Sequence, residues 1–247
     1  MAGEDRVSLC KGCWSQMHMP IPIRGPLSLP FRLLGIAPSK MNPNVCTICE
    51  RAFATVKKSK QISSEATILF ADLRGYTRLT ERIGAVEVAP LLRAFYDQCA
   101  QAIWQQDGIV NKSMGDGLLA IFNFPIQVDD HPRRALTAAR DIQRNCGANL
   151  RRLQADLGLD AEEIGVGVGL DSGPVEIGEF SVGHTDYTAI GSVVNLAARL
   201  ESRAAAGEIL VSVAVYDAAR DLCPDAELRQ LDVKGFDRPV DVRAIVH

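Results

Sequence analysis

The sequence predicts an α+β sandwich with a small cysteine-rich appendage at its N-terminus. Short apolar runs typical of strands alternate with segments whose apolar residues recur at helical spacing, and two glycine-containing turns each join a pair of expected strands. The chain has 247 residues, of which 47% are hydrophobic, so it can bury one large core. We predict a cysteine-rich module over residues 1–50, a helical connector over 51–65 and the main domain over 66–247.

The first part of the main domain predicts a central strand followed by a long helix. Residues 67–71 (TILFA) are an almost continuous apolar run, as in a strand buried on both faces. Residues 86–106 carry apolar side chains at helical spacing. Pro90 lies near the start of this helix, where the first turn tolerates proline, and Gly108 ends it.

The second part predicts further hairpins and helices. Residues 109–112 and 118–122 form a strand pair around the turn at residues 115–117. A second hairpin is expected around the Asp-Ser-Gly sequence at residues 171–173. The other expected elements are a helix at 131–157, the hairpin strands at 164–170 and 174–180, a helix at 192–203, a strand at 208–212 and two terminal strands.

Charge is unevenly distributed along the chain. The net charge of −3 gives no support for binding nucleic acid with the whole chain. Residues 1–60 hold nine Lys and Arg against three Asp and Glu, which leaves +6 there and −9 in the remainder. Two interpretations stay open for this basic module: it contacts a membrane surface or a regulator, or it docks on its own domain.

Targeting signals are not apparent in the sequence. No apolar run follows the N-terminus as in a signal peptide, and the apolar stretch at 19–37 is interrupted by prolines, glycines and arginines, so no membrane-spanning helix is expected. We therefore predict a cytoplasmic protein, whose seven cysteines are reduced or metal-bound rather than paired in disulfides.

Four cysteines of the N-terminal module form two CxxC pairs. Cys10 and Cys13 make the first pair, and Cys46 and Cys49 make the second. This pairing predicts a four-thiolate zinc site. An iron–sulfur cluster and a redox-active dithiol are the alternatives.

Two aspartates predict a second, different metal site. Asp72 lies in FADLRGYT (residues 70–77) and Asp116 in KSMGDG (residues 112–117), each close to glycine and to the end of an expected strand. If these strands are neighbours, the two carboxylates converge, and carboxylate oxygens are the ligands that hard divalent cations prefer. The alternative is that both aspartates only cap turns.

A third motif, TAIGSVVNLAAR at residues 188–199, completes a pattern that resembles the class III nucleotidyl cyclase family from about residue 66 onward. The resemblance implies a ferredoxin-like core and the conversion of a nucleoside triphosphate to a cyclic nucleotide and pyrophosphate. It also implies that Asp72 and Asp116 bind two Mg²⁺ or Mn²⁺ ions in each site. These ions would activate the ribose 3′-hydroxyl and neutralise phosphate charge.

The resemblance also implies roles for residues around the nucleotide. Gly75 and Thr77 match the turn that cradles the triphosphate, where helix-start amides bind phosphate. Lys234 matches a lysine that contacts the triphosphate. Asn195 and Arg199 are four residues apart and share a helix face, where Asn would hold the ribose and Arg would stabilise charge on the α-phosphate.

Lys112 and Thr188 are the expected base-reading residues. A lysine donor with a hydroxyl acceptor complements the ring nitrogens and the exocyclic amine of adenine. In the family, adenine-selective members carry Lys at the first position and Asp or Thr at the second, and Thr also occurs in a subgroup that includes bicarbonate-responsive cyclases.

These expectations together describe an adenylate cyclase, a phosphorus–oxygen lyase that acts on ATP. The family places its sites at a homodimer interface, with the aspartates from one subunit and the other site residues from its partner. Two alternatives remain. The chain could cyclise GTP or a pyrimidine nucleotide, or it could be a degenerate cyclase that binds nucleotide or a partner through its cysteine module.

Overall fold

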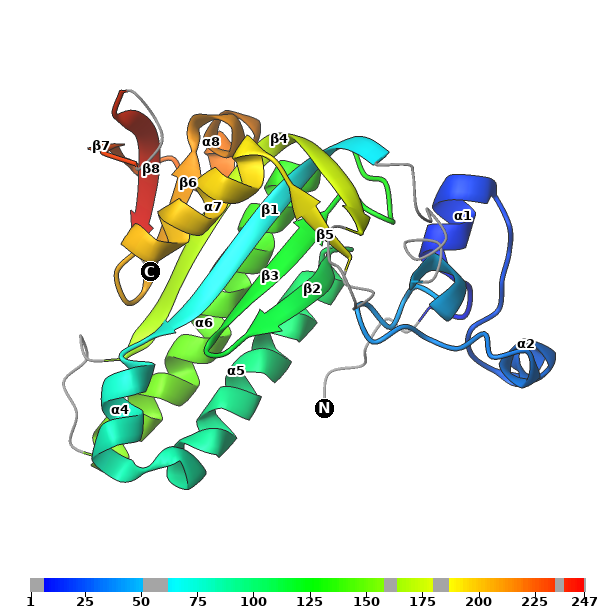
Figure 1. The fold of residues 1–247 in the computed structure, drawn as a ribbon, viewed down its shortest axis with the longest axis horizontal. Helices are drawn as coiled ribbons and strands as arrows, with labels where there is room; N and C mark the ends of the chain where they lie inside the picture. The colour runs from blue at the N-terminus through cyan, green and yellow to red at the C-terminus, as the bar shows by residue number, and fades with distance from the viewer. Residues whose placement is uncertain (1–6, 51–61, 158–163, 180–186, 234–237, 247) are drawn as a thin grey trace.

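The computed structural model of the protein describes residues 7–50, 62–157, 164–179, 187–233 and 238–246. An eight-stranded sheet forms its centre, and helices cover both faces (Figure 1). The helices are α1 (Lys11–Met17), η1 (Pro26–Ser28), α2 (Leu29–Leu33), α4 (Tyr76–Ile83), α5 (Ala85–Gln105), α6 (His131–Leu157), α7 (Ser192–Arg203), α8 (Val213–Ala218) and η2 (Arg220–Leu222). The strands are β1 (Ile62–Arg74), β2 (Ile109–Met114), β3 (Gly117–Phe122), β4 (Gly165–Glu179), β5 (Tyr187–Ile190), β6 (Glu208–Ser212), β7 (Glu227–Leu231) and β8 (Val240–Val246).

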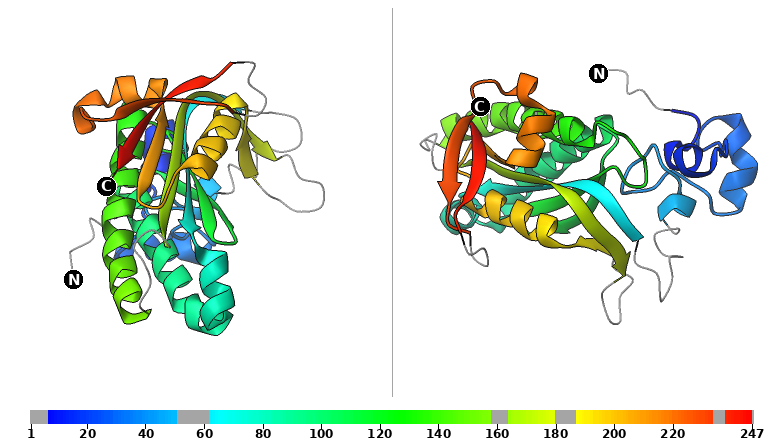
Figure 2. Two further views of the ribbon diagram at one scale, coloured as in Figure 1. Left: turned by 90° about the vertical axis from the view of Figure 1, so that its left-hand side faces the viewer. Right: turned by 90° about the horizontal axis from the view of Figure 1, so that it is seen from above.

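The strands follow the order β2-β3-β1-β4-β6-β8-β7, and β5 pairs with β4 outside this path. Only β4 and β6 run parallel; the other pairs are antiparallel. Helices α5, α6 and α8 pack on one face of the sheet, and α7 lies on the opposite face (Figure 2). The expected mixed α+β sandwich is therefore confirmed.

Several elements have the boundaries that the sequence predicts. The helix at 131–157, the helix at 192–203 and the strand at 208–212 match α6, α7 and β6. The long helix predicted for 86–106 is α5, but it begins at Ala85, so Pro90 lies in its second turn rather than its first. The predicted strand at 67–71 is the centre of the longer β1.

The hairpin predicted around residues 171–173 is wrong. Strand β4 runs through these residues without a turn and pairs with β1 along all thirteen positions from Ile62 to Arg74. The hydroxyl of Thr67 donates a hydrogen bond to the Ser172 hydroxyl across the pair (2.9 Å). Ser172, which the sequence placed in a turn, therefore has a hydrogen-bond partner within the continuous β1–β4 ladder. The strand that folds back on the end of β4 is instead β5.

The N-terminal module docks on its own main domain. Lys11 Nζ pairs with Asp107 Oδ1 (2.6 Å). The carbonyl oxygen of Met41 accepts hydrogen bonds from the Trp104 indole (2.6 Å) and from the Val110 amide at the start of β2 (3.0 Å). Most of the predicted connector, residues 51–61, lies outside the described residues. Among the helices that the structure describes, none is long and apolar enough to cross a membrane.

Candidate active site

The structure brings Asp72 and Asp116 together. Asp72 on β1 lies opposite Gly117 on β3, one residue after Asp116, and the Leu73 amide donates to the Asp116 carbonyl oxygen (3.0 Å). A Cβ at Gly117 would lie 2.9 Å from Asp72 Oδ1, so the absence of a side chain there leaves room for the carboxylate. Burial and then the negative charge of Asp116 raise the pKa of Asp72. A pair of carboxylates in this arrangement fits a hard divalent cation, which would relieve their repulsion.

Helix α4 begins directly beyond this pair. Gly75, with φ of +78°, makes the turn from β1 into the helix, a conformation that favours glycine. Thr77 lies exposed in the first turn of α4. The amide groups that start α4 therefore follow Asp72 by only a few residues, an arrangement that suits a phosphate beside a metal ion.

Tyr96 supports the turn that carries Asp116. Its hydroxyl donates to the carbonyl oxygens of Gly115 (2.7 Å) and Gly117 (3.3 Å), on either side of the aspartate. Burial and then the charge of Asp116 raise the pKa of Tyr96, which keeps it protonated as a donor. The sequence did not indicate this role, because Tyr96 lies on α5, far from the motif along the chain.

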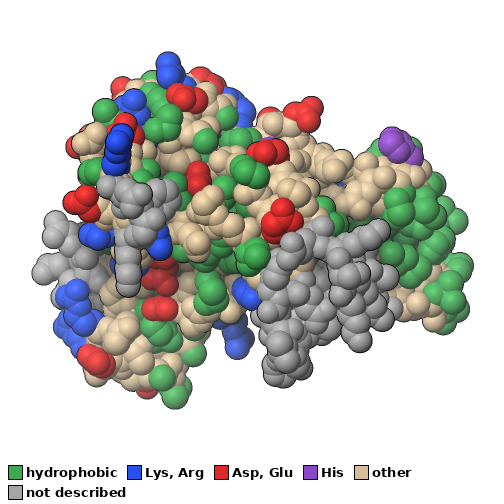
Figure 3. All heavy atoms as spheres, turned by 45° about the horizontal axis from the view of Figure 1, so that its top comes forward, with side chains coloured by type: hydrophobic (Ala, Val, Ile, Leu, Met, Phe, Trp, Pro, Cys, Tyr) green, Lys and Arg blue, Asp and Glu red, His purple; other side chains and the backbone are tan. Residues whose placement is uncertain are grey.

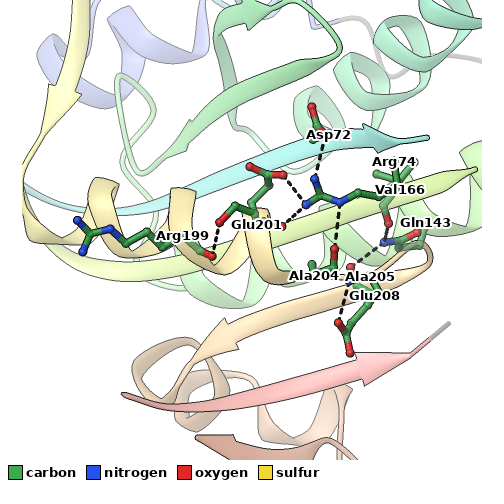
Figure 4. A network of polar contacts seen from close by, with 10 residues as sticks. Asp72, Arg74, Gln143, Val166, Arg199, Glu201, Ala204, Ala205 and Glu208 are labelled. Carbon is green, nitrogen blue, oxygen red and sulfur yellow. Dashed lines mark hydrogen bonds and ion pairs between the residues drawn. The ribbon is translucent and has the colours of Figure 1, made fainter. Parts of the chain in front are cut away.

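Arg74 joins Asp72 to the end of α7 (Figure 4). Its Nη1 donates to Asp72 Oδ2 (3.0 Å), its Nη2 donates to Glu201 Oε1 (2.5 Å) and to the Glu201 carbonyl oxygen, and its Nε donates to the Ala204 carbonyl oxygen (3.0 Å). The guanidinium lies over Gly167, where a Cβ would come within 2.5 Å of Arg74 Nε. Arg74 therefore positions the carboxylate of Asp72, a candidate metal ligand, and holds α7 against β1.

The other face of α7 carries Asn195 and Arg199. Residues two apart on a helix point in nearly opposite directions, so Arg199 cannot share the face that Glu201 turns toward Arg74. Figure 4 shows the Arg199 guanidinium directed away from Asp72. Asn195 lies one turn before Arg199 on the same face and is exposed. One chain therefore does not bring Asn195 and Arg199 together with the aspartate pair.

Thr188 is also remote from the aspartates along the sheet. It pairs with Gly178, whereas Asp72 pairs with Gly167, eleven residues earlier in β4. At about 3.3 Å per residue this is about 36 Å of strand. Its neighbour Ala189 is buried in the cluster on the α7 side of the sheet.

Lys112 extends from β2 just after a bulge between Val110 and Lys112. Lys112 and Thr188 are both half-buried. Lys234, the remaining predicted triphosphate contact, lies outside the described residues.

The four cysteines of the N-terminal module form a compact buried cluster. Their Sγ atoms all lie within 4.8 Å of one another, although the two CxxC pairs are separated by 32 residues. Cys10 caps the start of α1, where its Sγ accepts hydrogen bonds from the Cys13 amide (3.4 Å) and the Cys46 amide (3.1 Å). Burial raises the pKa of Cys13 to about 12, so this thiol is protonated unless a cation offsets the charge of its thiolate.

The spacing of the sulfur atoms fits one tetrahedral ion. The Sγ–Sγ distances are 3.5 Å for Cys10–Cys49, 3.4 Å for Cys13–Cys46 and for Cys13–Cys49, and 3.9 Å for Cys46–Cys49. Tetrahedral coordination with metal–sulfur bonds of 2.3 Å would place sulfur atoms about 3.8 Å apart. The predicted four-cysteine group is thus assembled and could hold a metal ion.

Comparisons with known proteins agree with this arrangement. Residues 58–240 match the family model described as the adenylate and guanylate cyclase catalytic domain. The chain is 30% identical over 213 residues to an adenylate cyclase of Anabaena cylindrica, an alignment that covers 81% of this chain and 40% of that protein. The chain thus spans less than half of that relative.

Solved structures show the same fold. The adenylyl cyclase CyaB from P. aeruginosa superimposes with a TM-score of 0.68 at 28% identity, covering 76% of this chain and 97% of that one. The guanylyl cyclase Cya2 gives a TM-score of 0.66 at 28% identity, covering 75% and 93%. Because the family model spans most of the sequence, the chain belongs to the class III nucleotidyl cyclases, the family of adenylate and guanylate cyclase catalytic domains.

Proposed function

We propose that the chain is an adenylate cyclase that converts ATP to 3′,5′-cyclic AMP and pyrophosphate. The observation that carries this proposal is the pairing of Asp72 with Asp116 beside the start of α4, in a chain of the cyclase family. A cytoplasmic location would supply ATP and keep the seven thiols reduced.

The reaction forms one phosphorus–oxygen bond and breaks another. The ribose 3′-oxygen attacks the α-phosphate, its proton is released, and pyrophosphate leaves from the opposite side. Asp72 and Asp116 would hold Mg²⁺ or Mn²⁺. The bound ions would lower the pKa of the 3′-hydroxyl and neutralise charge on the phosphates. The α4 amides after Gly75 bind the phosphates, with Thr77 and Lys234 as further triphosphate contacts. Asn195 positions the ribose, and Arg199 stabilises charge at the α-phosphate.

Adenine selectivity is assigned to Lys112 and Thr188. The Lys112 ammonium donates to a ring nitrogen of adenine, and the Thr188 hydroxyl accepts from its exocyclic amine. Solved relatives at the same identity are an adenylyl and a guanylyl cyclase, so overall similarity favours neither base. The proposal for ATP therefore depends on these two side chains.

The active unit that we propose is a homodimer with two shared sites. The Arg199 face of α7 is directed away from Asp72 within one chain, as Figure 4 shows. The position of Thr188 along β4 supports the same conclusion. The site that we propose combines Asp72 and Asp116 of one subunit with the α7 and β5 residues of a second copy, and we assign Lys112 of β2 to the same set. A two-fold dimer supplies both sets twice, which gives two equivalent sites.

Product analysis tests this function. Purified protein is incubated with ATP, GTP, CTP or UTP and either Mg²⁺ or Mn²⁺, and the products are separated by chromatography. We expect cyclic AMP and pyrophosphate in equal amounts, formed fastest from ATP. Faster cyclisation of another nucleotide would contradict the base assignment, and nucleotide binding without a cyclic product would favour a degenerate cyclase.

Exchanging the two base-reading side chains should change the substrate. The double substitution Lys112→Glu with Thr188→Cys reverses the donor and acceptor pattern, so we expect the preference for ATP to be lost and GTP to be used. The measurement is the ratio of kcat/KM for ATP and GTP, and a change of about tenfold or more is expected for a paired polar contact. An unchanged ratio in a folded, active variant would exclude Lys112 and Thr188 as base readers.

The four-cysteine group is proposed to bind one structural zinc ion. Sulfur spacing that fits a single tetrahedral ion favours zinc over an iron–sulfur cluster, whose several iron atoms would separate the thiolates further.

Replacing Cys46 with serine should remove this metal. We expect elemental analysis to fall from one zinc per chain to well below one, together with faster amide exchange in residues 7–50, because a site with three thiolates binds zinc less tightly. Cys223→Ser is the matched control, since Cys223 is a buried thiol outside the cluster. Wild-type protein without metal, or with iron and sulfide, would contradict the zinc assignment.

A further inference from the structure

Large apolar side chains are concentrated on the surface of the N-terminal module. Among the described residues, fourteen large hydrophobic side chains are exposed, and eight of them lie between residues 9 and 34. Figure 3 shows hydrophobic side chains gathered at the end of the molecule that this module forms. These eight residues, here called the apolar patch, are Leu9, Trp14, Met17, Met19, Leu27, Leu29, Leu33 and Leu34.

Within the described residues, the module does not cover this patch with its own chain. Its small interior is filled by the four cysteines and by side chains such as Ile23 and Val45. The helical segments η1 and α2 have three and five residues, so they expose most of their side chains. Leu33 is 89% exposed and Leu34 is 75% exposed at the end of α2, and both protrude into solvent.

Among the described residues, docking of the module on the main domain leaves the patch accessible. The contacts to the main domain that the structure describes use Lys11, Ser15, Gln16, the Asn42 side chain and the Met41 carbonyl oxygen, and Ile126 of the main domain packs on the module's buried cluster. None of these residues belongs to the apolar patch. The exposed leucines therefore neither pack in the interior of the module nor contact the main domain in these interactions.

The charged side chains of residues 7–49 all have one sign. Residues 7–49 contain no Asp or Glu, whereas Arg32 lies within α2 between the exposed leucines, and Lys40 follows it; both are exposed. An apolar surface on a segment whose charged side chains are all cationic complements a surface that offers acyl chains beneath negative headgroups. Exposed tryptophan, here Trp14, is also common at the boundary between lipid and water.

We propose that the apolar patch docks the protein on an anionic phospholipid surface as a reversible, peripheral contact. Leu33 and Leu34 enter the boundary between headgroups and acyl chains, while Arg32 and Lys40 contact the headgroups. A lipid surface fits better than a peptide groove, because α2 is too short to present the several turns of an anchoring helix. If the chain is a homodimer, two patches would act together and strengthen a contact that is weak for one copy.

Vesicle co-sedimentation of the full chain tests this proposal. Vesicles of phosphatidylcholine alone are compared with vesicles that also contain phosphatidylserine, at low and at high salt. We expect binding to the anionic vesicles that weakens as salt is raised. The double substitution Leu33→Ser with Leu34→Ser should lower partitioning by about tenfold or more, since two protruding leucines lose their apolar burial. Arg32→Glu should weaken binding to anionic vesicles specifically.

The matched control is Leu228→Ser, which removes an exposed leucine of β7 outside the patch. This variant should bind as the wild type does, and metal content should be equal in all variants. Absence of wild-type binding to anionic vesicles at low salt would overturn the proposal, as would an equal loss in the Leu228 control. Concentration-dependent self-association that the Leu33/Leu34 variant abolishes, without vesicle binding, would instead make this face an interface between copies.

Discussion

Replacing Asp72 or Asp116 with alanine is expected to abolish cyclisation. Each substitution removes a carboxylate from the pair that β1 and β3 bring together. Charge stabilisation by a bound metal is worth several kcal/mol, and each ~1.4 kcal/mol corresponds to a factor of ten in rate. We therefore expect kcat/KM to fall by at least about a hundredfold, measured as cyclic nucleotide formed with saturating Mn²⁺.

Controls separate this loss from a loss of structure. Asp72→Asn keeps the shape of the side chain and should also be inactive, whereas Asp241→Ala, at an exposed position of β8, should retain activity. Thermal unfolding should show that the variants stay folded, because burial and the charge of Asp116 disfavour the Asp72 carboxylate by more than its ion pair with Arg74 favours it. Full activity of either alanine variant with Mn²⁺ would contradict the assignment of these residues to the metals.

The aspartate pair could be predicted because the information is local. Asp72 ends an apolar run, Asp116 lies in a glycine turn, and two neighbouring strands suffice to join them. The four-cysteine group was also predictable, because two CxxC pairs in one small module are typical of a metal site that all four thiolates share. Helices α6 and α7 were predictable from their periodicity.

Other features depend on contacts that a single sequence does not reveal. Arg74 and Glu201 are 127 residues apart, and nothing in either local pattern indicates that they form an ion pair (2.5 Å). The sequence at 171–173 has turn composition, but pairing with all of β1 keeps β4 extended. In both cases the structure depends on a partner that is distant along the chain: Glu201 for Arg74, and β1 for β4. Local composition does not identify such a partner.

The division of the site between subunits is the central claim of this account. Asp72 is tied through Arg74 to the inner face of α7, whereas Arg199 lies on the face that is directed away from Asp72 (Figure 4). Asp72→Ala and Arg199→Ala homodimers should both be inactive, because each damages both sites. In a mixed dimer, one site carries both substitutions and the other pairs an intact Asp72 with the intact Arg199 of its partner.

Mixing the two variants tests this division directly. Random exchange of equal amounts makes about half of the dimers mixed, each with one intact site, so about a quarter of wild-type activity should return. Mixing Asp72→Ala with Asp116→Ala is the matched control and should restore nothing, since both residues serve the same half of the site. Recovery of about a quarter in the first mixture and none in the second is the predicted result. No recovery in the first mixture despite confirmed subunit exchange would mean that Asp72 and Arg199 of one chain serve the same site, which would contradict the account.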